Sequence, residues 1–196
     1  MTRTFERRVF PLSDIQIRAA SDTAQSLTFT GRAVVYDQLS EDLGGWQEVV
    51  KPGAATRSLA AKPDVRFLIN HDPNLLLART TSGTLQLVED AEGVRVDAEM
   101  ADVSHARDLA VLLERRDITQ MSFGFWIVAD GWAGSLHEIR EFDFDGGDVS
   151  VVTYPAYTQT SAELRQIATE RIAQAAGYPL ERAKHRLHEL DLLSQI

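Results

Sequence analysis

A β-rich α+β fold is predicted by three features of this 196-residue sequence. Apolar and polar residues alternate in seven or more short segments, and this period of two is typical of half-buried strands. Few segments between them have the spacing of a helix. After Pro155 the pattern changes, and apolar residues recur every three or four positions. Many short strands with few helices between them favour a barrel or a sandwich of sheets.

The predicted strands are the segments with the clearest apolar character: residues 27–35, 65–69, 84–88, 94–100, 118–128, 138–144 and 149–154. The third and fourth segments flank the turn-like residues 89–93, so we expect a hairpin with a longer loop. In the fifth segment, Met121, Phe123 and Phe125 lie on the core face, because every second side chain of a strand points to the same side. Ser122 therefore lies on the opposite face, which is expected to face solvent.

Helices are predicted at two places among the strands. Residues 53–61 form a short one directly after a proline. A second helix is expected to begin near Ser104, which is a good N-cap residue. Leu109, Leu112 and Leu113 follow on one helical stripe, which is expected to be buried.

The C-terminal residues 159–196 are expected to form a helical arm behind a β-rich domain at 1–158. Residues 160–163, Thr-Ser-Ala-Glu, match the capping box that opens a helix. Gly177 is expected to end this helix before a second one begins. The two helices are amphipathic, so each has one apolar side that must be buried somewhere.

Composition and charge exclude several classes of protein. The net charge is −9 and no basic run is present, which argues against nucleic-acid binding. The apolar runs are only a few residues long, so we expect no membrane span and no secretory signal. There is no cysteine, so a disulfide framework, thiolate zinc ligands and a cysteine nucleophile are all excluded.

His71 is the first candidate for chemistry among the five histidines. It follows the predicted strand 65–69 directly and begins a loop that contains Pro73. Catalytic groups are concentrated on loops that a rigid scaffold positions. The alternative is a surface histidine bonded to Asp72. His185 and His188 lie three residues apart in the arm, and without an evident third ligand we expect them to be solvated.

Ser122 and Asp148 are the other two candidates. Ser122 lies two residues before Gly124 on an otherwise apolar strand, where a glycine can allow the close approach of another chain. Asp148 follows two glycines and precedes the last predicted strand. With His71 they provide a nucleophile, a base and a group that orients the base. An ordinary exposed serine and an ordinary strand-start acid are the alternatives.

Six segments of the sequence, in this order, resemble the prohead maturation proteases of tailed bacteriophages. The resemblance extends from about residue 27 to 160. The segments are residues 31–36 (GRAVVY), 45–54 (GWQEVVKPGA), 70–72 (NHD), 79–85 (RTTSGTL), 121–125 (MSFGF) and 148–156 (DVSVVTYPA).

This resemblance implies a serine endopeptidase related to the herpesvirus assemblins, which are β-barrels wrapped by helices. It places the family's histidine at His71 and its serine at Ser122. The phage family usually has a glutamate where this chain has Asp148, and the assemblins use a second histidine as the third residue. His137 is therefore the alternative to Asp148.

The expected substrates are scaffold and capsid-protein precursor segments, cleaved inside the assembling procapsid in the bacterial host cytoplasm. No metal or organic cofactor is needed, and analogy with the assemblins suggests a homodimer. One rival is a non-catalytic assembly or scaffold-docking protein on the same barrel. A second rival is a hydrolase with a metal bound to His71, Asp72 and His105.

Overall fold

This computed structural model describes residues 5–11, 16–19, 27–43 and 45–154. The predicted arm at 159–196, with His185 and His188, lies outside the described residues. The described part is β-rich with few helices, as the sequence predicted. None of its helices is long and apolar enough to cross a membrane.

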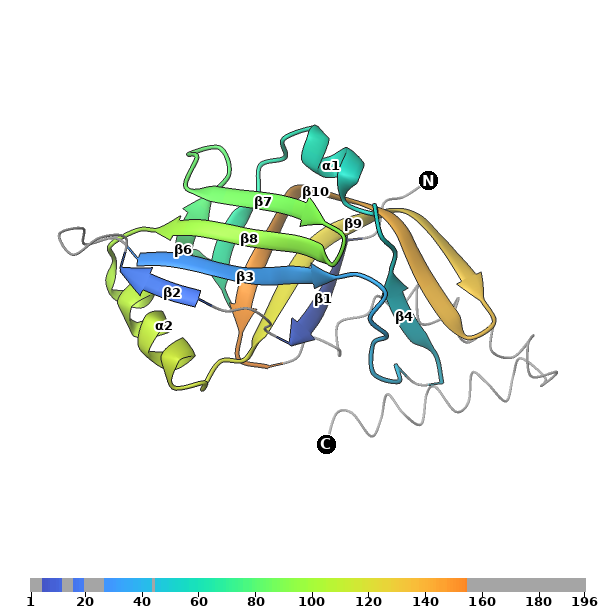
Figure 1. Ribbon diagram of the computed structural model, residues 1–196, viewed down its shortest axis with the longest axis horizontal. Coiled ribbons are helices and arrows are strands. Elements are labelled where there is room, and N and C mark those ends of the chain that lie inside the picture. The colour runs from blue at the N-terminus through green and yellow to red at the C-terminus, as the bar shows by residue number, and fades with distance from the viewer. Residues whose placement is uncertain (1–4, 12–15, 20–26, 44, 155–196) are drawn as a thin grey trace.

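One sheet of six strands carries the candidate residues (Figure 1). Its strands are β1 (Phe5–Pro11), β4 (Gln47–Val50), β5 (Arg66–Ile69), β6 (Asp72–Arg79), β9 (Gln120–Ala133) and β10 (Leu136–Val152). The order is β1-β9-β10-β5-β6, and β4 pairs with the first part of β10. β10 runs parallel to β4 and β5, and the other pairs are antiparallel.

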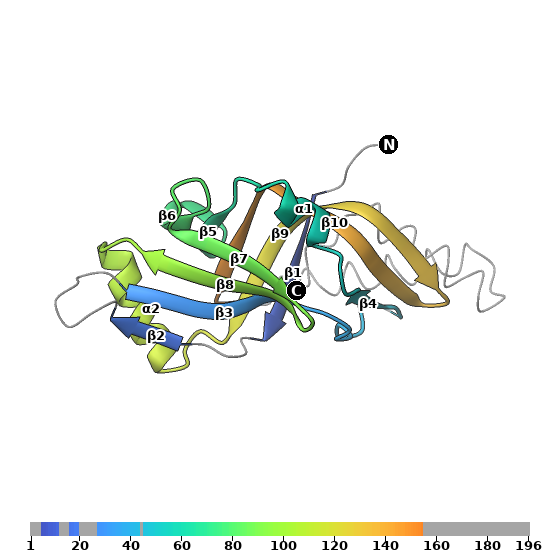
Figure 2. The ribbon, with the colours of Figure 1, turned by 45° about the horizontal axis from the view of Figure 1, so that its top comes forward.

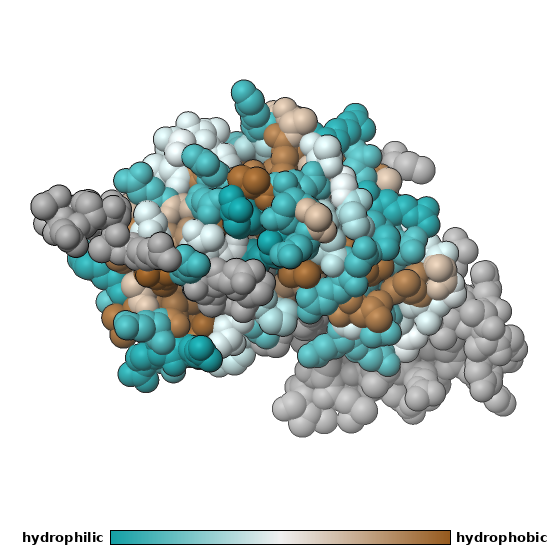
Figure 3. All heavy atoms as spheres, viewed as in Figure 1, coloured by the Kyte–Doolittle hydropathy of each residue, from teal (hydrophilic) through white to brown (hydrophobic). Residues whose placement is uncertain are grey.

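A second sheet of four antiparallel strands covers the first (Figure 2). Its order is β2 (Gln16–Ala19), β3 (Leu27–Val35), β8 (Gly93–Met100) and β7 (Leu85–Asp90). The helices are α1 (Thr56–Ala60) and α2 (Ser104–Glu114). Figure 3 shows an apolar patch over α2, where Val111 and Leu112 are exposed.

The hydrophobic core includes aromatic rings that pack between the two sheets. Phe29 of β3 contacts Phe67 of β5 with ring centroids 4.8 Å apart. On β9, the Phe123 and Phe125 rings stack at 4.4 Å, and Met121 is also fully buried. The core face predicted for this strand is therefore confirmed. Rigid packing beneath β9 and β10 fixes the strands that carry Ser122 and Asp148 on their other face.

One prediction about the strands was wrong, and the barrel that the resemblance implies is not confirmed. Residues 138–144 and 149–154 do not form separate strands, because β10 continues through them with a bulge between Asp143 and Asp148. Gly146, with a φ of +71°, takes up the extra residues of this bulge. In the described residues, the strand ladders follow two open paths, and no closed barrel is found.

The connection between β7 and β8 is also tighter than expected. Asp90 pairs with Gly93, so only two residues separate the strands. The Asp90 carboxylate accepts hydrogen bonds from the backbone N–H groups of Glu92 and Gly93, which closes the turn. Gly93 is required here, because a Cβ would lie 1.9 Å from the Val34 carbonyl oxygen.

Helix α2 begins at Ser104, the residue predicted to cap it. Val103, in extended conformation, is the N-cap residue, and no side chain caps the helix. Ser104 is the first helical residue instead. Leu109 and Leu113 are buried as predicted, whereas Leu112 is 38% exposed because it lies at the edge of the apolar stripe.

Candidate active site

His71 lies in the two-residue turn that joins β5 to β6. Ile69 pairs with Asp72, so Asn70 and His71 are the central residues. Their φ angles are +53° and +58°, and positive φ at both positions is typical of a type I′ turn, in which the second residue is usually glycine. A non-glycine residue in this conformation costs about 1–3 kcal/mol and persists only where its surroundings hold it.

Hydrogen bonds to β10 hold this strained turn. The backbone N–H of Asn70 donates to the Val151 carbonyl at 2.9 Å. The Asn70 side-chain oxygen accepts from the backbone N–H of Thr153 at 2.9 Å and from its hydroxyl at 3.2 Å. The backbone N–H of His71 donates to the Ser150 hydroxyl at 3.2 Å. The loop predicted after His71 is therefore much shorter, and Pro73 belongs to β6.

Ser122 and Asp148 lie on the same face of the six-stranded sheet. On adjacent strands, Ser122 of β9 is directly opposite Ser150 of β10, and Gly124 is directly opposite Asp148. Alternation along a strand puts these four residues on the face away from the core. The end of β5 lies beside β10, with Ile69 opposite Val151, and this register brings His71 over the same face.

A continuous chain of hydrogen bonds joins the three predicted residues. His71 Nδ1 lies 2.6 Å from Asp148 Oδ2, and His71 Nε2 lies 2.7 Å from Ser122 Oγ. A carboxylate only accepts hydrogen bonds, so Nδ1 must be the donor. In the neutral ring, Nε2 then has the lone pair and accepts the Ser122 hydroxyl proton. This is the arrangement in which imidazole can remove that proton.

Ser122 is buried, although it was expected to face solvent. It is 0% exposed, and the side chains of His71 and Asp148 are only 8% and 10% exposed. Strand β1 is one reason, since it pairs along the outer edge of β9 with Val9 opposite Ser122. A peptide carbonyl can reach Ser122 Oγ only after the atoms that cover it have moved.

Two glycines allow the strands to pack closely at this site. A Cβ on Gly147 would lie 2.1 Å from the carbonyl oxygen of Gly124. A Cβ on Gly124 would lie 2.8 Å from both Asp148 Oδ1 and the Phe5 ring. The space beside Gly124, which we expected to admit a bound chain, is therefore used by Asp148 and Phe5.

Asp72 and His105, which the rival metal site requires, form hydrogen bonds with other groups. Asp72 accepts hydrogen bonds from the backbone and side chain of Asn74, and not from His71. His105 Nε2 lies 2.9 Å from the carbonyl oxygen of Leu76. Among the described residues, no group of three or more His, Asp or Glu side chains is arranged to hold a metal ion.

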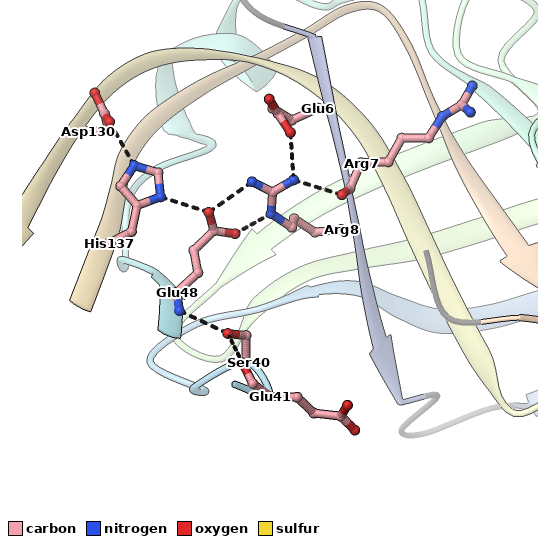
Figure 4. Close-up of polar contacts among 8 residues, drawn as sticks. All are labelled: Glu6, Arg7, Arg8, Ser40, Glu41, Glu48, Asp130 and His137. Atoms are coloured by element: carbon pink, nitrogen blue, oxygen red, sulfur yellow. Dashed lines mark hydrogen bonds and ion pairs between the residues drawn. The ribbon is translucent and has the colours of Figure 1, made fainter. Parts of the chain in front are cut away.

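His137, the alternative third residue, lies in a different cluster of buried charges (Figure 4). Its Nδ1 is 2.7 Å from Glu48 and its Nε2 is 2.7 Å from Asp130. Glu48 also binds Arg8 of β1 through both carboxylate oxygens, and Arg8 binds Glu6 at 2.9 Å. We call these five residues the His137 cluster. His71 is not a member of it.

The charges of the His137 cluster stabilise one another. Burial alone would raise the pKa of the Glu48 carboxyl, but Arg8 and His137 outweigh it and lower this pKa to about 2. Burial would lower the pKa of His137, but its hydrogen bonds and attraction to Glu48 and Asp130 raise it overall. The Trp132 ring stacks on the imidazole with centroids 4.7 Å apart. A protonated His137 suits this site.

The sequence reasoning missed Ser150 and Asn70 as members of the candidate site. Ser150 is fully buried and donates its hydroxyl to Asp148 Oδ2 at 2.6 Å. Ser150 could have been predicted from its position two residues after Asp148 in a strand, which puts both side chains on one face. The asparagine before His71 could have indicated the turn, since asparagine tolerates positive φ.

Comparisons of the chain with protein families and with solved structures agree with the resemblance drawn from the sequence. A model of the caudovirus prohead serine proteases matches residues 13–175. The solved structure of the bacteriophage T4 capsid assembly protease, gp21, is similar in fold, with a TM-score of 0.55. The match covers 76% of this chain and 98% of that chain at 9% identity. No curated protein matches the chain. Since the family model matches most of its length, the chain belongs to the caudovirus prohead serine protease family.

Proposed function

We propose that this protease is a serine endopeptidase in which Ser122 is the nucleophile, His71 the general base and Asp148 the residue that orients His71. The observation that carries the proposal is the unbroken hydrogen-bond chain from Asp148 through His71 to Ser122. Membership of a prohead serine protease family supports the protease role.

The proposed reaction follows from the positions of the ring nitrogens. Ser122 Oγ attacks the scissile carbonyl carbon while its proton moves to His71 Nε2. Asp148 Oδ2 accepts a hydrogen bond from Nδ1–H throughout and stabilises the imidazolium that forms. The imidazolium then gives its Nε2 proton to the leaving amine, and an acyl-enzyme remains on Ser122. A water molecule, activated by the same nitrogen, attacks the ester and releases the second product.

The proposed substrates are scaffold and capsid-protein precursor segments during prohead maturation. The family description, a prohead serine protease of caudoviruses, supports a reaction in the prohead, and the proposed location is the assembling procapsid in the bacterial host cytoplasm. The similar T4 structure is that of a capsid assembly protease, which supports the same class of substrate. A homodimer remains a proposal by analogy.

The test of this function is the Ser122→Ala variant of the full chain. Cleavage of scaffold and capsid precursors should fall on the order of a millionfold, because the nucleophile of a triad is lost. Thermal stability should fall by no more than in a variant that loses a buried hydroxyl elsewhere, since only one hydroxyl and its hydrogen bond to His71 are removed. Ser58→Ala, which removes a hydroxyl from α1, serves as the control and should cleave normally.

Proteolysis that persists in purified Ser122→Ala would contradict the serine mechanism. A wild-type chain that binds scaffold protein but never cleaves it would instead support the non-catalytic assembly protein. The first outcome is measured with the variant and the second with the wild-type chain, so the two outcomes are distinguishable.

A further inference from the structure

We propose that Ser150 is a positioning residue, whose hydroxyl orients both the Asp148 carboxylate and the turn that carries His71. This inference rests on the proposed serine-protease function. Ser150 Oγ lies 2.6 Å from Asp148 Oδ2 and 3.2 Å from the backbone nitrogen of His71. One hydroxyl therefore contacts both the carboxylate and the residue whose imidazole this carboxylate holds.

The direction of both hydrogen bonds is fixed by chemistry. A backbone N–H can only donate, so the hydroxyl oxygen must accept from His71. A carboxylate only accepts, so the hydroxyl proton must point to Asp148. Oδ2 also accepts a hydrogen bond from His71 Nδ1, with the two atoms 2.6 Å apart. Two donors from different directions thus hold the same oxygen of Asp148 in line with the imidazole.

The Ser150 hydroxyl serves two groups at once from a buried position. Ser150 is 0% exposed and lies opposite Ser122, between Asp148 and the turn. Without its hydroxyl, the His71 N–H loses this acceptor and Asp148 Oδ2 loses one of its two donors. Because His71 has a φ of +58°, its turn depends on such bonds to stay in position.

Ser58 provides a matched control for a purely structural role. It is 5% exposed, donates to Asp143 Oδ1 at 3.0 Å and accepts from the backbone N–H of Phe144 at 2.8 Å. The bonding pattern is that of Ser150, with a buried hydroxyl between a carboxylate and an amide. Neither of these two bonds involves His71 or Ser122, so Ser58→Ala removes equivalent bonds outside the site.

The experiment compares Ser150→Ala with Ser58→Ala in the full chain, with diisopropyl fluorophosphate as the probe. The serine oxygen forms a bond to phosphorus, fluoride leaves, and the serine proton goes to His71. The reaction therefore measures activation of Ser122 without a known peptide substrate. Both variants should lose similar thermal stability. Only Ser150→Ala should label about 10- to 100-fold more slowly at saturation, the size seen for residues that orient a functional histidine.

Further measurements separate orientation from general damage. The half-saturating probe concentration should not change in Ser150→Ala, because Ser150 does not contact the probe. Ser150→Thr, which keeps the hydroxyl, should label within about threefold of wild type if orientation is the cause. In an Asp148→Ala background, Ser150→Ala should slow labelling far less, because the carboxylate through which it acts is gone.

Wild-type labelling in Ser150→Ala, or equal slowing in Ser58→Ala, would overturn the inference. If Ser150→Ala does not fold, Ser150→Cys replaces it, since a thiol has nearly the same size and is a weak donor. Its labelling rate should then lie between those of wild type and Asp148→Ala, and a wild-type rate would again overturn the inference. Failure of the wild-type chain to label at Ser122 would contradict the proposed function itself.

Discussion

Two buried histidines, His71 and His137, have opposite surroundings. His71 lies between the Asp148 carboxylate and the Ser122 hydroxyl, at 2.6 and 2.7 Å. His137 lies between two carboxylates, Glu48 and Asp130, both at 2.7 Å. The His137 side chain is fully buried, and that of His71 is 8% exposed. The difference lies in the second partner, which can give up a proton beside His71 but can only accept one beside His137.

This difference separates a base from a fixed cation. A ring between two acceptors must donate from both nitrogens, so it is protonated and cannot take another proton. A ring between a carboxylate and a hydroxyl donates with one nitrogen and accepts with the other. We therefore assign His71 to proton transfer in the proposed reaction and His137 to structure, where it ties β10 to β4 and, through Arg8, to β1.

The largest effect that distinguishes the two histidines is expected from Asp148→Asn. An amide can donate to Nδ1 and so favours the wrong imidazole tautomer. Turnover should fall up to about ten-thousandfold, by analogy with the same change in another serine protease triad. Steady-state cleavage of a precursor fragment at saturating concentration measures this change.

His137→Ala is the comparison variant for this measurement. It should lower thermal stability and leave the turnover of the folded fraction within a few fold of wild type. If His137→Ala lost more turnover than Asp148→Asn, the third residue would be His137 and the proposed assignment would be wrong.

The next effect in size concerns stability and tests the His137 cluster. Glu48→Gln removes the carboxylate that Arg8 and His137 share, and leaves two buried cations without it. Breaking a buried pair in this way costs about 3–5 kcal/mol, which denaturant unfolding measures. Asp117→Asn provides the control, since its pair with Arg115 is exposed and contributes at most about 1 kcal/mol. Equal losses in the two variants would show that burial adds nothing.

The sequence predicted the core better than the edges of the sheets. Long apolar stretches such as 118–128 identified β9 and its core face, because alternation with large aromatic residues is a strong signal. β1, β2, β4 and β6 were missed. In β1, Glu6 and Arg8 are buried only because Glu48 and His137 approach from distant parts of the chain. No local pattern shows that such charges will be paired.

The candidate site shows the same limit. Residue types and family segments were sufficient to name His71, Ser122 and Asp148, which the structure brings together. They did not predict that His71 would occupy a two-residue turn, since histidine is uncommon at a position that favours glycine. Nor did they predict that Ser122 would be buried, because this depends on β1, which pairs with β9 from far along the chain.

The smallest expected effect is the pH dependence of stability that the His137 cluster contributes. The pKa of Glu48 is lowered from 4.5 to about 2 on folding, so its contribution is present above about pH 4.5 and is lost as the pH falls toward 2. The pKa of His137 is raised above 6.5, so its contribution is present below pH 6.5 and is lost as the pH rises through the higher folded value. Glu6, Arg8 and Asp130 are the other charges that face these two groups.

The unfolding free energy of wild type minus that of Glu48→Gln should therefore be largest between about pH 4.5 and 6.5 and decline on both sides. Measuring the difference removes the titration of all distant groups, and the same difference for Asp117→Asn should be small at every pH. A difference that stayed constant from pH 2 to 8 would show that folding shifts neither of these two pKa values through the cluster, and the contrast between the two histidines would then fail.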